Sequence, residues 1–274
     1  MEGLKSIEDV ANYEGNATEV LFKRLHNDKI KNQIIDTLFR GEQSKIGTFI
    51  ESLEVDEQEN VVLDPSTGEP IIKERVPYVP KTREELEQSY TETLSQIESQ
   101  TEIAFSENPY VSSNVEAMYV GSVAPWSGKP FTPKQMSITE AHEKGHKIRE
   151  YHGTFFDEYF RAGFDFDDVY FGEKDAAIYR KAIGPEDGNK PIEEVRQIFF
   201  EYLSEPAELT ERMSQLKNYF GMDSDESFTK SHLDYARVHY ISDTEMDNGM
   251  TQFFQAITPK TESEFLKIIN SVGV

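Results

Sequence analysis

The chain of 274 residues contains no cysteine and a single tryptophan, and basic residues are scarce relative to acidic ones. Without cysteine the chain has no disulfide and no thiolate, so any metal ion must be held by nitrogen and oxygen ligands. Its 28 lysine and arginine residues against 51 aspartate and glutamate residues give a formal net charge of −23. Because phosphates and anionic lipids are repelled by such a surface, we expect neither nucleic acid nor a membrane as a partner.

Long apolar runs are also missing. No apolar stretch reaches the ~20 residues that a membrane-spanning helix requires, and residues 1–9 lack the apolar segment of a signal peptide. We therefore expect a cytoplasmic protein, with a virion as the alternative location. The hydrophobic content of 37% is enough to bury one good core, or one core with a small appended domain.

Helical periodicity predominates, so we predict an α+β fold that is mainly helical, with a small sheet. Five late segments have helical apolar spacing: 192–203, 206–220, 230–240, 247–257 and 262–269. Residues 83–105 also form a helical pattern, but their few apolar positions predict a solvated or partner-facing helix rather than core. Short apolar runs at 61–63 and 71–72 flank a turn-rich stretch and predict a hairpin, and 114–123 is the best other strand candidate.

One short motif carries chemistry: His142 and His146 enclose Glu143 in the pattern H-E-x-x-H, in a chain with only six histidines. On a helix, residues four apart lie about 40° apart around the axis, so both imidazoles can bind one metal ion. A zinc ion held in this way lowers the pKa of a bound water, and an adjacent carboxylate can take its proton. The motif therefore predicts hydrolysis of an amide bond.

The form Ala141-His142-Glu143-x-Gly145-His146 resembles the active-site helix of the zincin metallopeptidases. The resemblance implies zinc as cofactor, bound by the two histidines, with Glu143 as general base. It also implies a zincin-like domain over residues 81–274 with the active-site helix near 137–152. Apolar patterns predict an N-terminal helical segment with a hairpin before it, over residues 1–80.

Three charged residues depart from the family pattern, in which the corresponding positions are uncharged. They are Glu140, Lys144 and Lys147. These positions fall on other parts of the helix circumference and are compatible with a solvated face. The departure leaves open a copy of the motif that no longer catalyses a reaction.

Two regions of the sequence offer a third metal ligand: His152, and the glutamates of residues 205–211. His152 follows His142 by ten positions, as in the metzincins, but Arg149 stands where that motif needs a glycine to break the helix. A continuing helix would turn His152 roughly 80° away from His142. His152 therefore remains the less favoured ligand.

The preferred third ligand is Glu208, which implies the gluzincin type. Pro206 marks a helix start, and Glu208 with Arg212 resembles the E-x-x-x-R/E pattern of a second active-site helix. Glu205 and Glu211 are alternatives, although Glu205 directly precedes a proline and is expected to be extended or capping. The pair Glu208 and Arg212 is also compatible with an ordinary ion pair four residues apart on a helix.

We therefore predict a zinc-dependent metallopeptidase in which His142, His146 and Glu208 bind the metal and Glu143 activates water to cleave a protein or peptide substrate. Residues 247–254 and 265–270 resemble the ends of phage-encoded proteins of this kind. That resemblance implies the alternative of a structural or virion-packaged protein, which keeps the zincin-like fold, with or without metal and without activity, and binds virion proteins. A third hypothesis is a helical interaction protein with a chance motif.

Overall fold

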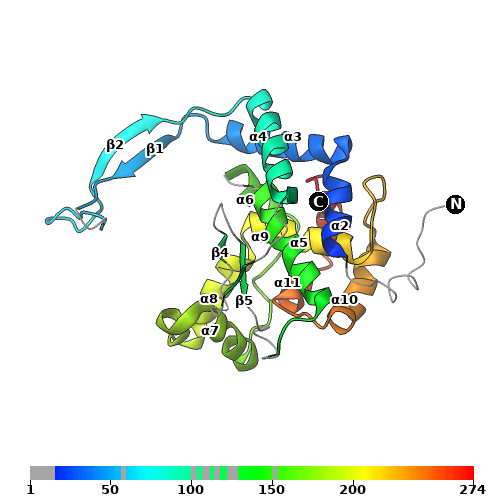
Figure 1. Ribbon diagram of the computed structural model, residues 1–274. Coiled ribbons are helices and arrows are strands. Elements are labelled where there is room, and N and C mark those ends of the chain that lie inside the picture. The colour runs from blue at the N-terminus through cyan, green and yellow to red at the C-terminus, as the bar shows by residue number, and fades with distance from the viewer. Residues whose placement is uncertain are drawn as a thin grey trace.

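The computed structural model describes residues 16–56, 60–99, 104–106, 112–113, 118–121, 129–149, 151 and 154–274, and these residues are mainly helical (Figure 1). The helices are α2 (Ala17–Leu25), α3 (Asp28–Ser44), α4 (Arg83–Ser99), α5 (Pro133–Arg149), α6 (Thr154–Arg161), α7 (Glu173–Gly188), α8 (Ile192–Leu203), α9 (Pro206–Tyr219), α10 (Lys230–Thr244), α11 (Met250–Ala256) and α12 (Glu262–Ile269). The strands are β1 (Phe49–Leu53), β2 (Ile72–Pro77), β3 (Ala104–Ser106), β4 (Ser112–Ser113) and β5 (Met118–Gly121). The expected mainly helical α+β class is confirmed at this level.

Two small sheets accompany the helices. In one, β5 pairs in parallel with β3 and antiparallel with β4. In the other, β1 and β2 form an antiparallel pair that projects from the helical body as an arm, which we define as the described part of residues 46–79 (Figure 1). The predicted hairpin is present as a short pairing: Leu63 and Pro70 form an antiparallel bridge, and the Ile71 N–H donates to the Val62 carbonyl at 2.9 Å. The longer ladder, which the sequence did not predict, joins residues 49–53 to 72–77.

The root of the arm is held by Glu42 at the end of α3. Its carboxylate accepts hydrogen bonds from the Tyr78 hydroxyl and, at 2.9 Å, from the backbone N–H of Lys81. Burial opposes ionisation of Glu42, but these donors and Lys45 lower its pKa, while burial and the Glu42 carboxylate raise the pKa of Tyr78 to about 12. The two ends of the arm also meet, because the Tyr78 N–H donates to the Thr48 carbonyl at 3.0 Å.

One hydrophobic core joins helices from both ends of the chain. Helix α5 packs against α2, α4 and α9, and α9 also contacts α2, α6, α8 and α12. Fully buried side chains from α2, α3, α9 and α12, such as Leu21, Ile34, Met213 and Phe265, belong to the same cluster. The boundary predicted at residue 80 stays a prediction. Among the described residues, no helix combines the length and hydropathy needed to cross a membrane.

Helix α4 corrects the expectation that residues 83–105 face solvent or a partner. Its four apolar residues, Leu86, Tyr90, Leu94 and Ile97, are all buried, and they recur at helical spacing along one side. The Tyr90 hydroxyl donates to the Leu25 carbonyl at 2.7 Å, which fastens α4 to the end of α2. A narrow apolar stripe was thus sufficient to dock a helix whose remaining surface is charged.

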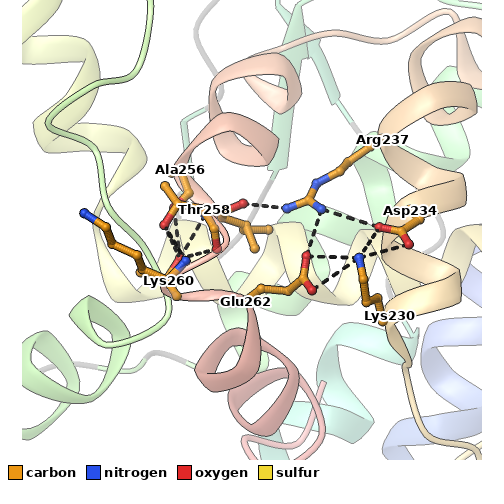
Figure 2. Close-up of polar contacts among 9 residues, drawn as sticks. Lys230, Asp234, Arg237, Ala256, Thr258, Lys260 and Glu262 are labelled. Atoms are coloured by element: carbon orange, nitrogen blue, oxygen red, sulfur yellow. Dashed lines mark hydrogen bonds and ion pairs between the residues drawn. The ribbon is translucent and has the colours of Figure 1, made fainter.

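Ion pairs connect α10 to the segment that enters α12. Figure 2 shows Glu262 between Lys230 and Arg237, at 3.3 and 3.0 Å, while Lys230 also pairs with Asp234 at 2.8 Å. Arg237 donates in addition to the carbonyl of Ile257, which precedes α12. These contacts hold helices of the core together and lie apart from the motif on α5.

Candidate metal centre

Helix α5, which carries the motif, begins at a capping box. The Thr132 N–H donates to Gln135 Oε1 at 2.9 Å and the Gln135 N–H donates to Thr132 Oγ1 at 3.3 Å, so each side chain satisfies the other's backbone. Pro133 occupies the first turn, where its missing N–H costs nothing. The helix starts four residues before the predicted position 137 and is described through Arg149.

Helix α9 supplies the opposite wall. Pro206 lies at its N-terminus with Glu205 as N-cap, as the proline predicted. Every residue from Glu208 to Tyr219 is buried, polar ones included, because α9 runs through the middle of the helical body. Helix α9 therefore brings Glu208 directly against α5.

The three predicted ligands converge between these helices. His142 Nε2 and His146 Nε2 lie 3.0 Å apart, and Glu208 Oε1 lies 3.1 Å from His146 Nε2. The second carboxylate oxygen, Oε2, is 3.5 Å from His142 Nε2. His142 and Glu208 are buried and His146 is partly buried, so the structure forms a compact group of two imidazoles and one carboxylate.

These separations match those of ligands around one small cation. Four ligands arranged tetrahedrally at zinc-to-nitrogen or zinc-to-oxygen distances of about 2.0–2.1 Å lie about 3.3 Å from one another. The Nε2 atoms of His142 and His146 face each other, and the Glu208 carboxylate faces both of them. In addition, the buried Glu208 Oε2 accepts no well-formed hydrogen bond among the described residues, although Arg212 Nη2 lies 3.4 Å from it. The donor set, nitrogen and oxygen without sulfur, therefore fits zinc.

The charges in the group are strongly coupled. Burial disfavours ionisation of Glu208, yet the charges and hydrogen bonds of His142 and His146 hold its pKa well below the usual value. Burial likewise disfavours protonation of His146, but the Glu208 carboxylate outweighs it and raises the pKa of His146 to about 9. Without a metal ion, a proton on His146 compensates the buried carboxylate.

Glu143 lies beside the ligand group on α5. Burial raises the pKa of its carboxyl, while the charges of His142 and His146 act in the opposite direction. A carboxylate whose pKa is raised is a stronger base than one in water, which suits a group that must accept a proton. The two neighbouring carboxyl groups therefore differ: the pKa of Glu143 is raised, whereas that of Glu208 is lowered.

Behind the ligand group, Arg149 and Glu211 form a buried ion pair. Arg149 Nη1 donates to both Glu211 oxygens, at 2.6 and 2.7 Å, and both residues are 1% exposed. The Glu211 carboxylate lies directly over Gly145, where a Cβ atom would overlap it. The glycine within the motif is therefore required for close packing of α9 on α5.

Arg212 secures Glu208 from within α9. Its Nη2 lies 3.4 Å from Glu208 Oε2, one helical turn away, and its Nη1 donates to the Asn248 carbonyl at 2.8 Å. The ion pair considered from the sequence is therefore present, but it occupies only one side of the carboxylate. Arg212 links the candidate ligand to the loop that precedes α11.

Tyr202, near the end of α8, is a site residue that the sequence analysis did not single out. Burial and the negative charge of Glu208 raise the pKa of its phenol well above the usual value, and Glu143 contributes in the same direction. The phenol therefore stays protonated and can donate a hydrogen bond near both carboxylates. The sequence contains one signal for this proximity: α8 and α9 are joined by a short turn, which places Tyr202 near Glu208.

The alternative ligands have other environments. Glu205 is exposed at the N-cap of α9, and both oxygens of Glu211 are engaged by Arg149. His152 lies outside the described residues. The expectation of a solvated Lys144 was wrong, because Lys144 is buried and pairs with Glu140 at 2.6 Å, close to the Phe22 ring.

No protein-family model matches this chain, and neither a curated protein nor a solved structure matches it. The chemistry of the centre must therefore be argued from its own residues.

Proposed function

We propose that the chain is a zinc-dependent peptidase in which His142, His146 and Glu208 hold the metal ion. The observation that carries the proposal is the spacing of three ligand atoms, 3.0 to 3.5 Å apart, between two packed helices. This spacing suits one tetrahedral cation with a fourth position left for water. The H-E-x-x-H pattern adds a base next to that position.

When bound, zinc would supply a Lewis acid that makes a coordinated water more acidic. Glu143 would accept a proton from this water at its carboxylate and pass it to the nitrogen of the leaving amine. Tyr202 would help to hold the Glu208 carboxylate, with which its phenol interacts. Arg212 would keep Glu208 oriented, because it holds the second oxygen of that carboxylate.

A second candidate function is a structural or virion-packaged protein that keeps a zincin-like fold, with or without metal, and has no catalytic activity. One observation favours it: the buried His142 Nδ1 finds no acceptor within the described part of the chain. Histidine ligands of metal enzymes almost always donate this N–H to a second group, which fixes the ring. The charged neighbours Lys144 and Lys147 are a further departure from catalytic relatives of the motif.

The test begins with the metal content of the purified chain and of His146→Ala and Glu208→Ala variants. We expect about one zinc per chain in the wild type and a loss in both variants, with folding checked by circular dichroism. Glu205→Ala is the matched control, since it removes a nearby exposed carboxylate from the same helix and should leave zinc in place. A wild type without zinc would refute the proposed site.

Activity is tested separately with a mixed peptide library and mass-spectrometric detection of cleavage. Glu143→Gln keeps the size and polarity of the side chain but removes the base, so it should retain zinc and lose cleavage by about 10²–10⁴-fold. Zinc binding without cleavage that depends on Glu143 would favour the structural function instead.

A further inference from the structure

The arm of residues 46–79 concentrates exposed apolar side chains. Ten of the twelve large hydrophobic residues that are exposed in the described part of the chain belong to it, with exposed fractions from 38% to 80%. They are Ile46, Phe49, Ile50, Leu53, Val55, Val61, Leu63, Ile72, Val76 and Val79. Scattered single apolar residues are normal on a surface, but a contiguous group of this size marks an interaction site.

Neither face of the arm is covered by the helical body. Every residue of β1 and β2 is exposed, and the pair forms a sheet of only two strands. A two-stranded hairpin alone is at best marginally stable in water. Each strand also has an outer edge without a ladder partner among the described residues, and such an edge can accept another strand.

The two faces of the β1–β2 ladder differ. On one face Arg75 pairs with Glu51 at 3.1 Å and lies over the Phe49 ring, 4.3 Å from its centre, so polar atoms cover part of the apolar surface. On the other face Ile50 and Val76 lie directly opposite each other, 52% and 38% exposed, and the next pair on that face is Ser52 opposite Glu74. This second face therefore offers a partner an exposed apolar pair beside an acidic side chain.

The negative charge of the chain favours a basic partner over a second copy of the same chain. In sequence, residues 46–79 contain eight acidic and two basic residues, a net charge of −6, within a chain of net charge −23. A second copy of this chain would place like charges opposite one another, which is unfavourable across strands and between whole molecules. A partner rich in lysine or arginine would instead be attracted and oriented by the same charges.

We infer that the arm is a docking surface for a basic partner protein, which adds an extended segment of alternating apolar and lysine or arginine residues to the β1–β2 sheet. Backbone hydrogen bonds at the strand edge would provide affinity, and the apolar and acidic side chains would provide selectivity. A standard protein interface buries about 800 Å² on each partner with about 20–30 residues per side, and the described residues 46–56 and 60–79 are enough to supply one side.

The experiment uses the full chain and a labelled twelve-residue peptide of alternating lysine and valine, with binding measured by fluorescence anisotropy. The comparison chain replaces residues 49–77 with a short glycine–serine link, which is feasible because Thr48 and Tyr78 are hydrogen-bonded to each other. We expect saturable binding that weakens as salt is added, and a dissociation constant at least tenfold higher for the chain without the arm. A peptide with glutamate in place of lysine should not bind.

A subtler variant, Ile50→Thr with Val76→Thr, keeps β-branched side chains and so preserves the strands while reducing the apolar face. It should weaken peptide binding at least threefold, whereas the matched control Val238→Thr, on α10 and 70% exposed, should not change it. Equal binding to the chains with and without the arm would overturn the inference. Dimerisation of the wild type through the arm, detected by light scattering, would also overturn it by identifying a second copy as the occupant.

Discussion

Replacing Glu211 by alanine is expected to lower the free energy of unfolding by about 3–5 kcal/mol. The change removes one member of a buried ion pair and leaves the Arg149 guanidinium, 1% exposed, without its compensating charge. Two hydrogen bonds of 2.6 and 2.7 Å are lost, and the remaining partners of Arg149, the Gly273 carbonyl and the Ser214 hydroxyl, are neutral. A loss of this size is a large part of the ~5–15 kcal/mol that stabilises a typical domain.

The assay is urea unfolding at pH 7 in the presence of a chelator, followed by far-ultraviolet circular dichroism, so that metal binding does not contribute. The double variant Arg149→Met with Glu211→Leu removes both charges and should recover most of the loss, because apolar replacement of a whole buried pair is often nearly neutral. A loss below about 1 kcal/mol for Glu211→Ala would refute the reasoning, as would a double variant less stable than Glu211→Ala itself.

Three further results are expected. Tyr202→Phe should lower zinc affinity about 10–100-fold, the usual cost of losing a group that supports a metal ligand, and unchanged affinity in chelator competition would exclude that role. Zinc affinity, measured by chelator competition, should rise as pH increases towards 9, because the pKa of His146 is about 9 in the metal-free protein and its proton must leave before the ring can bind metal. The stability that protonated His146 contributes to the metal-free chain is fully present below about pH 6.5 and is lost as pH rises through 9. A zinc affinity that does not change with pH would contradict this assignment. Leu94→Ala should destabilise the chain by about 2–5 kcal/mol in thermal or urea unfolding, since Leu94 is buried in the core, and a change below about 0.5 kcal/mol would return α4 to the solvated helix predicted from sequence.

Local signals predicted much of the helical framework. The observed bounds of α8 and α12 coincide with the predicted ranges 192–203 and 262–269, and α9 begins at Pro206 as its proline indicated. These elements have clear apolar stripes and start signals. Helix α4 was assigned to the wrong environment because its four apolar residues are few in proportion to its charged ones, and burial depends on which neighbours they meet.

In the candidate site, too, some residues could be predicted from local sequence and others depend on how the helices pack. His142, His146 and Glu143 come from one helix, so their proximity follows from spacing along the chain. Glu208 required the placement of a second helix, which the structure provides at 3.1 Å from His146. Tyr202 and the packing of Glu211 over Gly145 were beyond prediction, because they depend on how α8 and α9 meet α5 in three dimensions.

The position of the centre between α5 and α9 has a consequence for the folding equilibrium. Its ligands are 62 residues apart along the chain, so an ion bound by all of them would act as a cross-link that exists only in the folded state. By mass action, free metal at a hundred times its dissociation constant would add about 2.7 kcal/mol to the stability of the folded chain. The fraction of molecules that remain folded would then follow the availability of zinc in their surroundings.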